Sequence, residues 1–110
     1  MELKLDIYNG KVIEKTYVSN DFALMTGTCE DILKLIDIEK IGDLDDDTSI
    51  MEVVKIVLNA FQEFNPLMKQ IFEGLTDDEY RRTHIVDVAR VVIDVLKYTL
   101  KELFTASSKN

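Results

Sequence analysis

The sequence predicts an α+β protein, mainly α, in which an N-terminal β-hairpin precedes about four to five helices. Leu3, Leu5 and Ile7 alternate with charged residues, which is the period-two pattern of a strand with one buried face. The pair Asn9-Gly10 follows at once and is typical of a tight hairpin turn. Residues 83–104 form the longest apolar-periodic run, without Gly or Pro, and this run predicts a long C-terminal helix.

The hairpin is expected over residues 2–18, because the segment after the turn is rich in β-branched and aromatic residues. A two-stranded ribbon is marginal on its own, so it must pack on the helices or extend a neighbour's sheet through its open edge. The helical part is expected over residues 19–104. It starts with a brief helical turn that Gly27 ends, and a helix over about 28–39 with Thr28 as its N-cap follows.

Three local patterns divide the middle of the chain. An apolar stripe at helical spacing runs from Ile50 to Phe64 and predicts a core helix. Pro66 favours the start of a short helix that reaches Phe72, and Gly74 favours its end in a left-handed conformation. Thr76 and Glu79 have the spacing of a capping box, which predicts another short helix before the long one.

The C-terminal helix has more apolar surface than one stripe requires. Thr83 is expected to cap it, and the stripe that contains Val88 and Val92 is expected to face the core. A helix that is apolar around its circumference needs cover on more than one side, so we expect a partner or a second copy of the chain to contact it. The residues expected at this contact, with two basic residues that precede the helix, are Val86, Val91, Val95, Tyr98, Arg81 and Arg82. The two arginines are equally able to pair with Asp77, Asp78 or Glu79.

Length and charge limit the classes of protein that this chain can belong to. With 110 residues it is expected to form one domain over residues 1–104, followed by a flexible polar tail over 105–110. The formal net charge of −8 argues against a nucleic-acid partner, whose phosphates require Lys and Arg. Charged residues within 83–104 argue against a membrane span. A single cysteine and the lack of a signal-peptide pattern indicate a reduced, cytoplasmic protein.

No residue pattern indicates catalysis, a metal or a cofactor. Asp43, Asp45 and Asp47 have the spacing of calcium ligands, but Thr48 and Val54 stand where that loop needs Gly and Glu. The one His and the one Cys cannot supply a zinc site, and neither a phosphate-binding loop nor a nucleophile elbow is present. We therefore expect a non-enzymatic protein without cofactors.

The order of these parts resembles a known family. The hairpin with Asn-Gly-Lys, the strand ending Glu-Lys-Thr-Tyr, the Glu-Asp-Ile-Leu-Lys-Leu-Ile-Asp helix and above all Pro66 to Thr83 resemble tail assembly chaperones. These are proteins of long-tailed phages and prophages of Gram-positive bacteria. The resemblance covers about residues 2–104 and rests on architectural motifs, none of which is catalytic.

The resemblance implies a function in tail assembly. It implies a chaperone that binds the tape measure protein, keeps it soluble, helps to recruit tail tube subunits, and works in the host cytoplasm without entering the virion. It further implies a longer frameshifted form that binds the tube protein, and the ending Ser108-Lys109-Asn110 is compatible with a slippery codon run. The residues leave open an alternative, a small acidic adaptor or regulatory protein that binds a host or phage partner through the Asp43–Asp47 loop.

Overall fold

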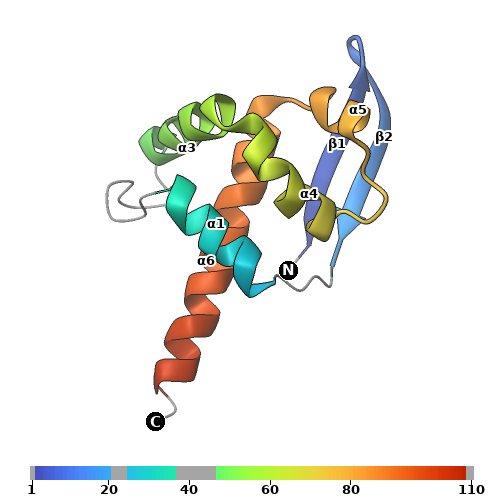
Figure 1. The fold of residues 1–110 in the computed structure, drawn as a ribbon. Helices are drawn as coiled ribbons and strands as arrows, with labels where there is room; N and C mark the ends of the chain where they lie inside the picture. The colour runs from blue at the N-terminus through green and yellow to red at the C-terminus, as the bar shows by residue number, and fades with distance from the viewer. Residues whose placement is uncertain (1, 21–24, 37–46, 109–110) are drawn as a thin grey trace.

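The computed structural model describes residues 2–20, 25–36 and 47–108, with side chains over 50–98 in the last of these ranges. An N-terminal antiparallel hairpin is followed by helices and ends in a long C-terminal helix, so the predicted α+β, mainly α, fold is confirmed (Figure 1). The elements are β1 (Leu3–Asn9), β2 (Val12–Ser19), α1 (Thr26–Leu35), α3 (Asp47–Asn59), the 3₁₀ helix η1 (Phe61–Phe64), α4 (Asn65–Ile71), α5 (Asp77–Arg81) and α6 (Ile85–Ser108).

The hairpin is more irregular than its sequence indicates. The strands pair from Leu3 opposite Ser19 to Asn9 opposite Val12, so Asn9 belongs to β1 and the turn consists of Gly10 and Lys11. Within the hairpin, Gly10 alone has a positive φ, of 65°, whereas the predicted Asn-Gly turn needs a positive φ at both residues. The register also shifts between Ile7 and Tyr8, and this β-bulge leaves Glu14 as the extra residue of β2.

The short helices in the middle follow their local signals. Pro66 lies in the first turn of α4, where its missing N–H costs no helical hydrogen bond. Gly74 has a φ of 91°, which side-chain-bearing residues rarely adopt. The Glu79 N–H donates to Thr76 Oγ1 (3.1 Å), and the Thr76 N–H donates to Glu79 Oε1 (3.0 Å). The predicted capping box is therefore confirmed.

Other predicted helix ends were wrong. Helix α1 begins at Thr26, so Gly27 lies in its first turn and does not end a helix. The Thr28 hydroxyl accepts a hydrogen bond from the Gln70 side chain of α4 instead of capping α1. The helix predicted from Ile50 to Phe64 is broken at Ala60, whose φ of −126° and ψ of 37° are not helical, and it continues as η1. The predicted segments that fall on residues 21–24 and 37–46, including most of the aspartate run, lie outside the described residues.

Helix α6 is the axis of the fold. It packs against α3 and against β1, and Figure 1 shows the hairpin beside the first turns of α6, with β1 nearer to the helix than β2. The inward side chains of β1 join the stripe of α6 in one buried core that contains Leu3, Leu5, Ile7, Val88, Ala89, Val92 and Leu96. Within the described side chains, the predicted stripe is buried at Val88, Ala89, Val92 and Leu96 and partly buried at Ile85.

The start of α6 is set by a different residue from the predicted one. Helix α6 begins at Ile85, so Thr83 lies before the N-cap position, and its hydroxyl donates to the Tyr80 carbonyl (2.7 Å). The His84 carbonyl instead accepts the N–H groups of Asp87 and Val88. Tyr80 is fully buried, stacks on Phe61 with 4.0 Å between ring centroids, and ties α5 to η1. The helix runs to Ser108, beyond the predicted end at residue 104.

Candidate interaction surface

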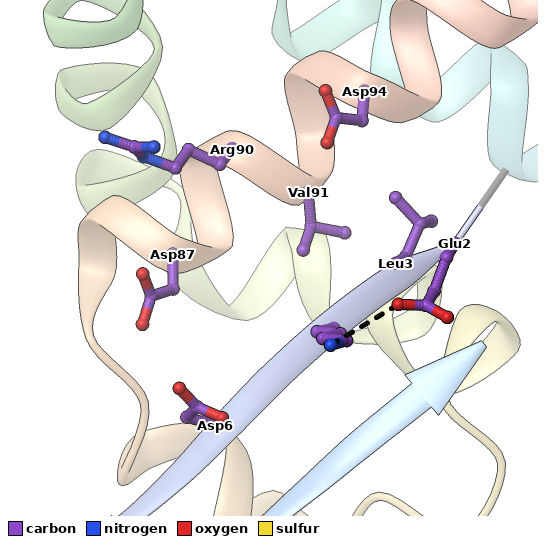
Figure 2. Close-up of a pocket in the computed structure, with 8 residues that line it drawn as sticks. Glu2, Leu3, Asp6, Asp87, Arg90, Val91 and Asp94 are labelled. Atoms are coloured by element: carbon purple, nitrogen blue, oxygen red, sulfur yellow. Dashed lines mark ion pairs between the residues drawn. The ribbon is translucent and has the colours of Figure 1, made fainter.

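The structure corrects the prediction for the off-stripe side of α6. Val91 and Val95 are buried, with exposed fractions of 3% and 1%, so the expectation that they await a partner was wrong. The reason is that β1 and α3 together cover more of the helix than one layer would. Figure 2 shows Val91 pointing from α6 towards β1, beside Leu3. Of the same predicted set, Val86 and Tyr98 are exposed.

The two predicted arginines have different surroundings. Arg81 is exposed. The Arg82 guanidinium contacts Glu14 Oε2 (2.9 Å), Asp78 Oδ2 (3.0 Å) and the Tyr8 carbonyl (2.9 Å). These carboxylates raise the pKa of Arg82, whose charge is thus already matched within the chain. Arg82 therefore links the hairpin to α5 as a clamp. Its ion pair with Asp78 is one of the intrachain pairings that the sequence allowed as an alternative to partner binding.

The same clamp binds the free edge of β1 at Tyr8. The Tyr8 N–H donates to the Arg82 carbonyl (2.8 Å), and the Arg82 side chain donates to the Tyr8 carbonyl, so both backbone groups of Tyr8 have partners. The Tyr8 ring stacks on His84 with 3.7 Å between centroids. These contacts attach β1 to the segment between α5 and α6.

The inner face of β2 is held by one carboxylate. Glu79, in the first turn of α5, accepts from the Tyr17 hydroxyl (2.6 Å) and forms an ion pair with Lys15 (2.8 Å). The carboxylate also accepts from the Thr76 N–H (3.0 Å) and from the Thr76 hydroxyl (3.2 Å). The Lys15 and Tyr17 contacts lower the pKa of the Glu79 carboxyl to about 2, so it is ionised at neutral pH. Four donors of the chain occupy this charged carboxylate, so we assign it a structural role.

Three large apolar side chains of β2 are exposed. Val12, Ile13 and Val18 have exposed fractions of 68%, 49% and 51%. The sheet has the order β1–β2, and within the described residues no strand lies along the other edge of β2. Figure 1 shows β2 as the outer strand of the hairpin, on the side away from α6. One strand thus combines an open backbone edge with exposed apolar side chains.

A second group of exposed apolar side chains lies on the helices. Its members are Met25 and Leu33, at the start and within α1, and Met51 and Leu58 on α3. Two of the four are methionines, whose flexible thioether side chains adapt to differently shaped apolar partners. These exposed side chains offer apolar contact area for a segment of another protein.

A groove of about 320 Å³ lies between β1 and the first turns of α6 (Figure 2). Leu3 and Val91 contribute its apolar part, while Glu2 holds Lys4 in an ion pair of 3.4 Å along one side. The other lining residues are Asp6, Asp87, Arg90 and Asp94. Carboxylates of both elements therefore face a wide opening, with cations interspersed among them.

The exposed residues of β2 were not among the site residues that the sequence predicted. A signal for them exists, because Val12 and Ile13 are adjacent and apolar in a strand, where neighbouring side chains point to opposite faces. A two-stranded ribbon that packs on one face must expose one of the two. The register places Val12 opposite Asn9, next to the turn, where both residues are exposed.

Comparisons of the chain with protein-family models, with curated proteins and with solved structures find no match. Within the described residues, no helix is both long enough and apolar enough to cross a membrane.

Proposed function

We propose that the chain is a non-enzymatic phage tail assembly chaperone, which binds the tape measure protein, keeps it soluble and helps to recruit tail tube subunits. The proposal starts from the resemblance of residues 2–104 to that family, whose most specific part is Pro66 to Thr83. That part forms α4 and α5, and through Arg82 and Glu79 it attaches the hairpin to the helices.

One observation carries the proposal further: large apolar side chains are exposed on a chain of net charge −8. A chaperone for an apolar helix needs apolar side chains that are exposed to solvent when the partner is absent. The helical group Met25, Leu33, Met51 and Leu58 supplies such contacts. The surplus negative charge makes complexes repel one another, which opposes aggregation of the bound segment.

Co-expression with apolar helical segments of a tape measure protein tests this function. We expect the segment to be insoluble alone and to co-purify with the chain when both are present. The double substitution Met51→Glu with Leu58→Glu should reduce capture, because it places charges in the apolar contact on α3. The matched control Val12→Glu with Val18→Glu makes the same change of charge on β2 and should leave capture unchanged.

A segment that stays insoluble beside the wild-type chain would rule out the chaperone function. Equal loss with both double variants would show that added charge alone weakens capture. Gene order gives an independent check, since a tape measure gene is expected just downstream.

A further inference from the structure

We propose that the free edge of β2 is a self-association site, where β2 of a second copy of this chain pairs antiparallel to it. The two copies then share one sheet with the strand order β1–β2–β2–β1. This inference goes beyond the proposed function, which requires only that each copy exposes apolar contacts to its client. Its evidence is the asymmetry between the two edges of the hairpin.

The two edges differ in how their backbone groups are satisfied. At β1, Tyr8 exchanges hydrogen bonds with Arg82, and α6 packs alongside. At β2, alternate N–H and C=O groups point away from β1, and no described strand lies beside them. Free strand edges of this length are ready templates for another strand, and natural proteins usually protect them with charges or Pro. Residues 12–19 contain no Pro, and both of their charges are already paired.

The local charge at the β2 edge does not oppose a second copy of the chain as the occupant. The turn and strand over residues 10–20 contain Lys11, Lys15 and Glu14, a formal net charge of +1 on a chain whose total is −8. Glu14 is paired with Arg82 at 2.9 Å, and Lys15 with Glu79 at 2.8 Å. An identical acidic chain therefore meets no local excess of negative charge at this edge. A basic partner would instead be attracted to the acidic remainder of the molecule.

Symmetry makes this pairing self-consistent. A two-fold axis perpendicular to the sheet makes the two β2 strands antiparallel. It also keeps equivalent faces of the two hairpins on the same side of the shared sheet. The face with Leu5 and Tyr17 stays towards the helices in both copies, and the face with Thr16 and Val18 becomes one continuous surface. The exposed β-branched side chains then gain cross-strand neighbours. A marginal two-stranded ribbon also becomes a four-stranded sheet.

Sedimentation equilibrium of the full chain over a wide concentration range tests the proposal. We expect a monomer–dimer equilibrium that tightens when NaCl rises from about 0.1 to about 1 M, because screening reduces the repulsion between two acidic copies. Val18→Glu should weaken dimerisation at least about tenfold, because each dimer contains the charge twice at the paired edge. Leu58→Glu, an equal change of charge at an exposed site on α3, should leave dimerisation unchanged.

Hydrogen exchange locates the contact independently of substitution. Amides within residues 12–19 that do not pair with β1 should gain protection as the concentration rises, and the exposed residues of α3 should not. Circular dichroism checks that Val18→Glu is folded, and Val12→Glu serves as a second variant at the more exposed position.

Three results would overturn the proposal. The first is a monomer at every concentration and salt level, and the second is a dimer that Val18→Glu and Val12→Glu leave intact. The third is a dimer that only Leu58→Glu disrupts, which would place the contact on α3. None of these results depends on tape measure capture, so failure here and failure of the proposed chaperone function are distinguishable.

Discussion

Replacing Glu79 by glutamine should destabilise the chain through one identifiable contact. The substitution keeps an oxygen acceptor for the Tyr17 hydroxyl and the Thr76 N–H, but it removes the charge that faces Lys15. The new amide also directs a donor towards the Lys15 ammonium, which has only donors. The loss therefore falls mainly on the ion pair and not on the geometry of the capping box.

The size of the effect follows from the Glu79 pKa. The fall from the ordinary pKa of 4.5 to about 2, at about 1.36 kcal/mol per pH unit, sets an upper bound of about 3 kcal/mol. The Lys15 side chain is 49% exposed, so solvent screens the pair, and we expect a cost of about 1–2 kcal/mol at pH 7. Because the folded pKa is below the unfolded one, this stabilisation is complete above about pH 4.5. It is lost as the pH falls towards 2.

Urea unfolding of the wild type and of Glu79→Gln at pH 7, 4 and 2.5 measures the stabilisation that the Glu79 charge provides. The difference in unfolding free energy between the two proteins should be largest at pH 7 and should shrink at each step down. Glu73→Gln, at an exposed carboxylate, is the control and should match the wild type within about 0.5 kcal/mol at pH 7. A Glu79→Gln protein as stable as the wild type, or a difference independent of pH, would refute the reasoning.

Three further substitutions test other parts of the fold by urea or thermal unfolding. Arg82→Ala should lower the unfolding free energy because it removes the clamp on β1, whereas Arg81→Ala, at an exposed position, should leave it close to that of the wild type. Gly74→Ala should cost about 1–2 kcal/mol because Gly74 has a φ of 91°. Gly27→Ala, within helix α1, should stabilise the chain by about 0.5–1 kcal/mol. An added Cβ meets no atom within 4 Å at either site, so the backbone conformation decides both effects. Val91→Asp should cost more than about 3 kcal/mol by burying an unpaired charge, and a folded variant with altered oligomeric state would contradict the burial.

The parts of the fold that the sequence predicts correctly depend on near neighbours. The Thr76–Glu79 capping box joins residues three positions apart, and the left-handed Gly74 needs only its own backbone. The alternation of Leu3, Leu5 and Ile7 likewise specifies which face of β1 is buried. Each of these signals reports a local hydrogen bond or a local period, so it survives whatever tertiary structure surrounds it.

Several of the wrong predictions concern contacts that residue type and periodicity do not specify. Arg82 donates to a carbonyl 74 residues away, at Tyr8, and no periodicity in either segment indicates that contact. Thr83 has the residue type of an N-cap, but the nearby Tyr80 carbonyl uses its hydroxyl. Val91 and Val95 look superfluous on a helical projection because the projection cannot show that two elements cover the same helix. Local composition therefore measures how much apolar surface a helix has, and tertiary packing decides whether it is covered.

The correction at Val91 and the open edge of β2 have a common cause. A two-stranded sheet has two edges, and β1 is the strand that packs against α6 and pairs with Arg82. Because that packing buries Val91, it also leaves β2 as the outer strand, with Val12 and Val18 exposed. The sequence predicts uncovered apolar surface on the C-terminal helix, but in the structure the uncovered apolar surface lies on the hairpin. If a second copy associates with this chain, the arrangement directs it to β2 and not to the buried side of α6.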